Sequence, residues 1–280
     1  MTESIRELYR IGRGPSSSHT IGPQRAAQQF LRENPLAKGF RVTLYGSLAA
    51  TGRGHLTDVA IQQTFAPLPL ELVWLADQAL PYHPNGMRFE ALDETGRTQS
   101  TWVVYSTGGG AIRSEGEEVA PNQVYEYTSM RDILKYCTKH GLAFWEYVES
   151  SEGPLIWEYL AEIKRVMFAS IDRGLRAEGV LPGGLGVARR AWMFYRKMRL
   201  SGPNPVQPGG FLPAYALAVA EENAAGGEIA TAPTCGSSGV LPAVLRHVAE
   251  NIDCPEESVL RALATAGLVG NLIKFNASIS

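Results

Sequence analysis

Residues 86–106, GMRFEALDETGRTQSTWVVYS, predict a β-hairpin and therefore decide the class of the first half of the chain. Met87, Phe89 and Ala91 alternate with less apolar neighbours, as they do in a strand with one buried face. The turn-forming residues DETG at 93–96 then lead into a second segment, rich in Trp, Val and Tyr, that favours a returning strand. The first half therefore contains an antiparallel sheet.

The segments around this hairpin extend the prediction. Residues 40–46, FRVTLYG, alternate like a half-buried strand, and residues 48–65 are typical of a glycine-punctuated turn that leads into a helix. After about residue 125 the apolar spacing becomes helical, and it is clearest in the set Ile156, Leu160, Ile163, Met167 and Ile171. We predict an α+β fold, with an α/β domain at 1–120, an all-helical domain at 121–280, and a join within 114–123.

Composition narrows the class of protein. The 280 residues are 45% hydrophobic and carry a net charge of −2, so the chain can form a sizeable core and has no basic field to attract nucleic acid. The N-terminus has no apolar leader, and the most apolar run, 259–275, contains Arg261 and Lys274 and is typical of a core helix. Three widely spaced cysteines fit a reducing compartment. We expect a cytoplasmic protein without nucleic-acid or membrane partners.

The stretch GRGPSSSHTIGPQRAA, residues 12–27, precedes a helix predicted to begin near Gly22. Pro15 and a single serine would be enough to cap that helix. Several hydroxyls, backbone amides and His19 at a helix N-terminus would also form a cradle for a carboxylate or a phosphate. From the residues alone, capping and anion binding are about equally supported.

Other glycine-rich stretches are interpreted structurally. In YGSLAATGRGHLTD, residues 45–58, the glycines match neither a dinucleotide-binding nor a P-loop pattern, and His55 is interpreted as a structural hydrogen-bonding residue. LPYHPNGM predicts a turn, and STGGGAI, at 106–112, predicts a bulge or a close backbone approach. LPGGLGVARRAW predicts a turn before a helix, with Arg189 and Arg190 on its solvent face.

Residues 231–245, TAPTCGSSGVLPAVL, form the most chemically distinctive stretch, because Cys235 stands among small polar residues just before an apolar helix. A thiol at a helix N-terminus has a lowered pKa, which suits nucleophilic attack or metal ligation. The alternative is that a lone cysteine is a small buried residue, but the polar surroundings favour function here. Cys137 is expected to pack in a helix, and Cys254 to be incidental in a loop.

Eight blocks of the sequence together carry a family resemblance. They are GPSSSHTIGP, YGSLAATGRGHLTD, LPYHPNGM, YSTGGG, LPGGL, YALAVAEENAAGG, TAPTCGSSGVLPAVL and IKFNASIS, and they run from residue 14 to the last residue. In this content and order the chain resembles the iron–sulfur L-serine dehydratases, also called L-serine ammonia-lyases. Eight blocks in order are far more specific than any one of them.

The resemblance implies an activity and a cofactor. Members of this family convert L-serine to pyruvate and ammonia with a [4Fe–4S] cluster and without pyridoxal phosphate. One iron of the cluster would act as a Lewis acid on the substrate hydroxyl while a base removes the Cα proton. The α/β part resembles an allosteric substrate-binding domain, and the helical part a cluster-bearing catalytic domain. A homodimer in the cytoplasm is expected.

The resemblance also implies roles for individual residues. His19 is expected to transfer a proton, and Lys274, in the last block, to act with it in catalysis. The substrate L-serine is expected to contact Ser16, Ser17, Ser18, Thr20, Asn276 and Ser278. An allosteric effector is expected at His83 and Asn85 in the HPN turn. Cys235 is expected to bind the cluster, with Ser238 beside it as a supporting residue that does not bind iron.

Two departures from the family pattern leave alternatives open. The family writes PTNGACG where this chain has PTCGSSG, so Cys235 stands at the Asn position and Ser238 at the usual ligand position; the ligand has either moved within the loop or been lost. Two further cluster cysteines follow NASIS in the family, whereas this sequence ends at Ser280, so a truncated or apo form would be inactive.

Two other function classes are alternatives to this enzyme. One is a serine-binding or sensing module without catalysis. The other is a pyridoxal phosphate dehydratase, which is not supported because the lysines lack a Ser-x-Lys setting; they are Lys135, Lys139, Lys164, Lys197 and Lys274.

Overall fold

The computed structural model describes residues 2–116, 123–201, 210–252 and 254–277. They form two compact units. The helical unit comprises Met1–Gly12 and Ala120–Ile279, and the sheet unit comprises Arg13–Val119. The predicted division at residue 120 therefore needs one correction, because the first twelve residues belong to the helical unit. The predicted join at 114–123 falls largely on 117–122, which lie outside the described residues.

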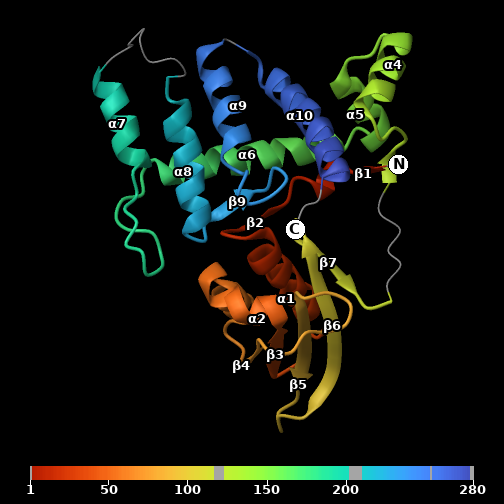
Figure 1. Cartoon of the computed structure of the whole chain (residues 1–280), viewed down its shortest axis with the longest axis vertical. Helices are drawn as coiled ribbons and strands as arrows, with labels where there is room; N and C mark the ends of the chain where they lie inside the picture. Colours follow the sequence, from red (N-terminus) through yellow and green to blue (C-terminus); the bar gives the residue numbers. More distant parts are fainter. Residues whose placement is uncertain (1, 117–122, 202–209, 253, 278–280) are drawn as a thin grey trace. The chain divides into compact units, whose positions relative to one another are not determined.

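The sheet unit is built on one five-stranded sheet (Figure 1). In spatial order its strands are β4 (Leu70–Leu75), β3 (Gly39–Tyr45), β5 (Gly86–Leu92), β6 (Thr98–Gly108) and β7 (Ala111–Ser114). The β3–β4 pair is parallel, and the other three pairs are antiparallel. The predicted hairpin is confirmed as β5–β6, with Phe89 opposite Trp102. The predicted irregularity at the glycine run is confirmed as well, because the β6–β7 register shifts between Ser106 and Gly108.

Two helices, α1 (Gly22–Glu33) and α3 (Thr57–Phe65), pack on one face of this sheet around a core of aromatic side chains. Phe65 of α3 stacks on Phe40 of β3 with ring centroids 4.3 Å apart, and Phe30 of α1 contacts the same core. The region predicted as a turn before α3 is already helical, with α2 (Gly46–Thr51) and the 3₁₀ turn η3 (Gly52–His55) directly after β3. The carboxyl end of β3 therefore passes at once into two short helical turns.

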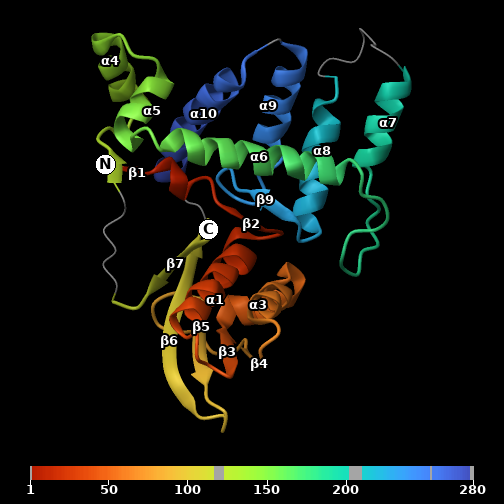
Figure 2. The same cartoon turned by 180° about the vertical axis from the view of Figure 1, so that it is seen from behind.

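The helical unit is organised around α6 (Ile156–Gly174), which lies across the unit in Figure 2. All five residues that gave the helical spacing in the sequence are fully buried there, so that prediction is confirmed. Around α6 lie α4 (Met130–His140), α5 (Phe144–Glu152), α7 (Ala191–Ser201), α8 (Leu212–Ala224), α9 (Val240–Asn251) and α10 (Glu256–Asn276).

This unit is not all-helical, contrary to the prediction. Strand β1 (Thr2–Glu3) pairs with β8 (Gln123–Tyr125), and β2 (Ile11–Arg13) pairs with β9 (Glu228–Ala230). These strands have only two or three residues, too few for an alternating pattern to be visible in the sequence. They hold the N-terminal segment against the helices.

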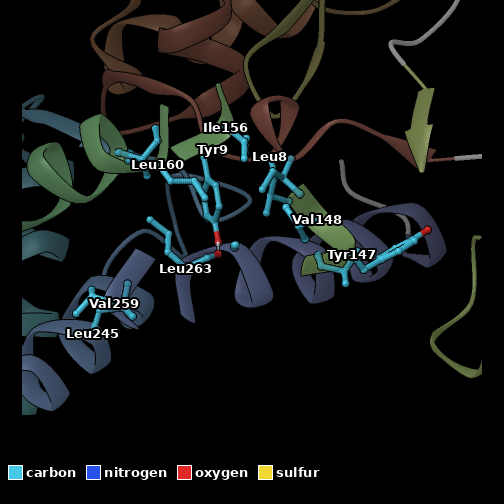
Figure 3. Close-up of a cluster of buried hydrophobic side chains, with 14 of the residues drawn as sticks. Leu8, Tyr9, Tyr147, Val148, Ile156, Leu160, Leu245, Val259 and Leu263 are labelled. Atoms are coloured by element: carbon cyan, nitrogen blue, oxygen red, sulfur yellow. Dashed lines mark hydrogen bonds between the residues drawn. The ribbon is translucent and has the colours of Figure 1, made fainter. Parts of the chain in front are cut away.

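Packing explains why the N-terminal segment joins the helices. Leu8 and Tyr9 are buried in the core shown in Figure 3, and the Tyr9 hydroxyl donates to the carbonyl oxygen of Leu263 at 3.0 Å. Helix α10 leaves room for the ring because Gly267 faces it, and a Cβ at Gly267 would lie 2.9 Å from the Tyr9 ring. The contact removes a large aromatic side chain from water.

Arg189 is also placed differently from the prediction. Its side chain is 10% exposed and pairs with Glu222 at 3.0 Å, instead of lying on the solvent face. Arg173 of α6 binds the same carboxylate at 3.1 Å, so two guanidinium groups neutralise one buried charge. Arg190 is exposed as predicted, and its amide donates to Glu221 at 2.6 Å.

Helix α10 is the one described helix that is long and apolar enough to cross a membrane by length and composition. In the structure 39% of its apolar window is buried, and its side chains Leu263 and Leu268 belong to the core of the helical unit. The predicted core helix is thus present.

Candidate functional site

The SSSHT segment forms a π-helical turn, η2 (Ser17–Ile21), that runs directly into α1. Ser16 caps this turn, since its Oγ accepts a hydrogen bond from the His19 amide at 3.1 Å. One hydroxyl thus performs the capping that the sequence allowed. The other hydroxyls of the segment are therefore not needed for capping.

His19 is held between two serine hydroxyls. Its Nδ1 lies 2.9 Å from Ser18 Oγ, and its Nε2 lies 3.0 Å from Ser47 Oγ. Burial lowers the pKa of His19, and the nearby His55 lowers it further. A neutral imidazole with a hydrogen-bond partner on each nitrogen can pass a proton in either direction.

His55, interpreted from the sequence as structural, lies beside His19, with the two ring centroids 4.8 Å apart. Its Nδ1 is 3.0 Å from the carbonyl oxygen of Thr51. Because a carbonyl oxygen only accepts, this contact places the proton on Nδ1 and leaves the lone pair on Nε2. In this tautomer Nε2 is the nitrogen that can accept a proton.

The HPN turn lies next to the same histidine pair. The amide of Ser47, whose hydroxyl contacts His19, donates to the carbonyl oxygen of Pro84 at 3.2 Å. His83 accepts at Nδ1 from the Asn85 amide at 3.1 Å. The two residues assigned to an effector therefore belong to the neighbourhood of the SSSHT turn, within one unit.

Two buried polar atoms in this neighbourhood have no hydrogen-bond partner within the described part of the chain. They are Asn85 Oδ1 and Ser106 Oγ, from residues that are 8% and 0% exposed. The two residues face each other, because the Ser106 amide donates to Asn85 O at 3.0 Å and Asn85 Nδ2 donates to Ser106 O at 3.3 Å. Unpartnered buried polar atoms are costly, so a polar ligand or water is expected here.

A glycine allows the Asn85–Ser106 pair to lie close to the start of α1. A Cβ at Gly22, the first residue of α1, would overlap Ser106 Oγ and lie 2.9 Å from Ser106 Cβ. Ser106 therefore approaches the backbone of the SSSHTIG segment closely. The segment, the histidine pair and the Asn85–Ser106 pair form one candidate site in the sheet unit.

The TAPTCGSSG loop of the helical unit differs from its prediction. Cys235 does precede α9, but it is 2% exposed, and burial raises the pKa of its thiol to about 12. The expected lowering of this pKa is wrong, because desolvation outweighs the helix terminus. Ser238, also buried, donates from Oγ to the Cys235 carbonyl oxygen at 2.7 Å, so it supports the cysteine's backbone.

Comparisons with known proteins identify the family. The model of the serine dehydratase alpha chain matches residues 110–280, and that of the beta chain matches 4–67 and 63–117. The L-serine dehydratase of Streptomyces coelicolor is 37% identical over 334 residues, a span that takes in 100% of this chain and 73% of the relative. The chain belongs to the serine dehydratase family.

Two further serine dehydratases are similar to this chain over nearly its whole length. The L-serine dehydratase of Haemophilus influenzae is 35% identical, and L-serine dehydratase 2 of Escherichia coli is 36% identical, each over 99% of this chain and 73% of its own length. The Streptomyces alignment is longer than the 280 residues of this chain, so the relative has internal residues without counterparts here. The two beta-chain matches meet at 63–67, where α3 leads to β4 through a short connection.

The cysteines bear on the cluster that the serine dehydratase resemblance implies. All three cysteines are in described parts of the chain, with Cys137 buried on α4, Cys254 half-buried between α9 and α10, and Cys235 in its own loop. No group of three His, Cys, Asp or Glu side chains that could hold a metal occurs among the described residues. The described residues therefore cannot by themselves complete a thiolate-ligated cluster, and each cysteine could contribute at most a single ligand.

The last sequence block makes its contacts inside the helical unit. Lys274 Nζ donates to Glu3 Oε2 at 2.8 Å and to the Glu7 carbonyl oxygen at 3.4 Å. Asn276 Nδ2 donates to Leu272 O at 2.8 Å within α10, and Ser278 lies outside the described residues. The roles of these three residues stay predictions.

Sequence reasoning missed His55, Ser47 and Ser106 as members of the site. A signal for His55 was present, since three of the five histidines, His19, His55 and His83, occur in the first 83 residues and next to glycine, serine or proline. Histidines gathered in predicted turns of one domain can meet at one end of its sheet.

Proposed function

We propose that this chain carries the substrate site of an L-serine dehydratase, which converts L-serine to pyruvate and ammonia. The observation that carries the proposal is the meeting of His19 and His55 beside two buried, unpartnered polar atoms, in a chain that belongs to the serine dehydratase family. The names of the relatives favour this enzyme over a serine-sensing module without catalysis.

The site has groups suited to both ends of a zwitterionic amino acid. Asn85 Oδ1 is an acceptor and fits the α-ammonium group, whereas serine hydroxyls can donate to the carboxylate. Ser17 and Ser18 are the donors best placed for this, in the turn at the start of α1. Ser16 caps the turn, and Thr20 already donates to the His55 carbonyl oxygen at 2.6 Å, so we assign these two to holding the turn.

The histidines provide the proton transfers. Loss of water from serine breaks the Cα–H and Cβ–O bonds and leaves aminoacrylate, which tautomerises and hydrolyses to pyruvate and ammonia. In our proposal His55 Nε2 accepts the Cα proton, since its Nδ1 is bound to Thr51. His19 exchanges protons through Ser18 or Ser47, and its lowered pKa keeps it neutral near neutral pH.

The proposal also includes an iron–sulfur cofactor. The resemblance implies a [4Fe–4S] cluster, which would supply Lewis-acid assistance to the leaving hydroxyl, and no pyridoxal phosphate. Cys235 is the cysteine we assign to it, and a metal would have to displace the proton that burial retains on this thiol. The remaining ligands must come from outside the described residues. We therefore propose that the 280-residue chain alone is inactive. The family resemblance is our ground for proposing that the enzyme with its full ligand set is a homodimer in the cytoplasm.

The test is pyruvate formation from L-serine, measured with a coupled lactate dehydrogenase assay after anaerobic treatment with iron and sulfide. A polypeptide with the complete ligand set should be active, and the 280-residue chain should be inactive. In the active form, His55→Ala and His19→Ala should each lower turnover by roughly 10² or more. Activity that requires pyridoxal phosphate, or that survives both substitutions, would overturn the proposal.

A further inference from the structure

The histidine pair is joined by two reciprocal hydrogen bonds. Thr20, which follows His19, donates from Oγ1 to the carbonyl oxygen of His55 at 2.6 Å. Thr57, two residues after His55, donates from Oγ1 to the carbonyl oxygen of His19. Each histidine backbone is thus bound by a threonine that accompanies the other histidine, and both threonines are fully buried.

These bonds differ from the usual use of a threonine in a helix. Thr51 and Thr64 donate to carbonyl oxygens four residues earlier in their own helices, at 2.9 and 2.8 Å. Thr20 and Thr57 instead reach across 35 and 38 residues of sequence. Local helix geometry does not require such bonds.

The backbone between His55 and Thr57 is strained in a way that serves this arrangement. Leu56 has a φ of 56° and a ψ of 28°, a left-handed conformation that no other non-glycine residue adopts in the described ranges. Strained residues of this kind persist where the surrounding structure fixes them, and they gather at functional sites. Thr57 is fixed tightly, because a Cβ at Gly52 would lie 3.1 Å from its Oγ1.

We propose that Thr20 and Thr57 are positioning residues that form a cross-brace fixing the spacing of the His19 and His55 imidazoles. The inference rests on the proposed function for its catalytic meaning, since proton transfer needs both rings in place around one substrate. Its structural content is independent of the substrate. Loss of either hydroxyl should let the two rings move apart.

The direct readout is the titration of His19 in the free protein, followed by NMR of isotope-labelled histidine. Proximity of His55 is one of the two causes that lower the pKa of His19. Thr57→Val keeps the shape of the side chain and removes the hydroxyl, so the pKa of His19 should move up toward its ordinary value. Thr57→Ser keeps a hydroxyl and should restore the titration of the parent protein. Thr20→Val tests the same brace from its other arm, should Thr57→Val fail to fold.

The matched control is Thr64→Val in α3, the helix that begins at Thr57. It also removes a threonine hydroxyl, but one that donates to the Ala60 carbonyl oxygen within the helix. In the catalytically complete enzyme, Thr20→Val and Thr57→Val should each lower kcat at least tenfold with a smaller change in KM. The double variant should be little worse than either single one, because one broken arm already frees the rings. Thr64→Val should leave kcat unchanged.

Two sets of results separate this inference from the proposed function. If the pKa of His19 rises in the valine variants while the complete protein never acts on serine, the brace stands and the proposed function fails. If the enzyme is active and needs both histidines, but Thr20→Val and Thr57→Val behave like Thr64→Val in titration and turnover, the brace is wrong.

Discussion

The Ser16–Gly22 segment of the sheet unit and the Thr231–Gly239 loop of the helical unit have similar compositions and different bonding. Both are rich in serine, threonine and glycine, and both precede a helix. In the first, two side chains bond to residues distant in sequence, since His19 contacts the Ser47 hydroxyl and Thr20 donates to the carbonyl oxygen of His55. In the second, Ser237 and Ser238 donate within the loop, to the carbonyl oxygens of Thr234 and Cys235, and among the bonds of the described residues only Thr231 at its start reaches a residue distant in sequence.

The difference teaches where reactivity can be found. A loop whose polar groups satisfy one another presents few of them to a ligand, and it buries Cys235 with its proton retained. The SSSHT turn has neighbours that lack partners, Asn85 Oδ1 and Ser106 Oγ. Composition alone does not distinguish the two segments, since the tertiary fold determines which hydrogen-bond partners their polar groups meet.

The largest expected effect is on thiol reactivity in the metal-free chain. Alkylation requires a thiolate, and a pKa of about 12 leaves Cys235 with roughly 10³-fold less thiolate than an unperturbed cysteine. We expect iodoacetamide to modify Cys254, which is half-buried, long before Cys235, and to modify both equally in denaturant. Peptide mass spectrometry over time measures this. Equal alkylation rates of Cys235 and Cys254 in the native protein would show that the Thr231–Gly239 loop is accessible, and would contradict the contrast between the two segments.

The next effect concerns the close approach at the helix start. Gly22→Ala places a methyl group against Ser106, and overpacking of this kind costs about 1–3 kcal/mol. Gly236→Ala in the other loop meets its nearest atom, Thr234 Oγ1, at 3.8 Å and should cost little more than nothing. Urea denaturation of both variants gives the two free energies of unfolding. A similar loss in both would remove the distinction between a crowded and a roomy loop.

A smaller effect is expected in the pH dependence of stability. Because the folded state lowers the pKa of His19, the unfolded chain binds more protons below the ordinary imidazole value of about 6.5. This contribution to stability is complete above that value and is lost as the pH falls through the lowered pKa. His19→Gln should therefore flatten the decline in the free energy of unfolding between pH 7.5 and 5, as followed by denaturation at each pH. An unchanged slope would contradict the burial of the imidazole.

The smallest effect separates two serines. Ser238→Ala removes the buried bond to the Cys235 carbonyl oxygen and should cost about 1 kcal/mol of folding stability. Ser18→Ala removes a partly exposed hydroxyl next to His19, so it should change stability less and the titration of His19 more. Thermal melts and histidine NMR on both variants measure the two effects. A larger loss of stability in Ser18→Ala, or a larger change in the titration of His19 in Ser238→Ala, would contradict this expectation.

Local patterns in the sequence predicted the elements well. The alternation of Met87, Phe89 and Ala91 specifies a strand face, and the spacing of Ile156 and Leu160 specifies a helix face, because each pattern acts over a few residues. The place of the N-terminal segment could not be predicted, since the bond from Tyr9 to Leu263 spans 254 residues. Strands of two or three residues leave no periodicity to detect.

Only part of the candidate site could be predicted from the sequence. His19 stands out because hydroxyls surround it in the sequence itself, and the structure places one of them, Ser18, on its ring, whereas the second ring partner, Ser47, is 28 residues away. His55 does not stand out, because its neighbours at the site, His19 and Thr20, are 35 residues or more away. The pKa of Cys235 was predicted with the wrong sign, since a helix terminus is visible in sequence and desolvation is not.

The anchoring of Tyr9 to α10 sets an order of events during synthesis on the ribosome. The sheet unit, Arg13–Val119, is continuous in sequence and can close as soon as it has emerged. Leu8 and Tyr9 emerge earlier still, but Leu263, the partner of Tyr9, is made 254 residues after it. Leu8 and Tyr9 must therefore wait, unpacked, while the residues up to α10 are translated, and they take their places in the core only after the sheet unit can have closed.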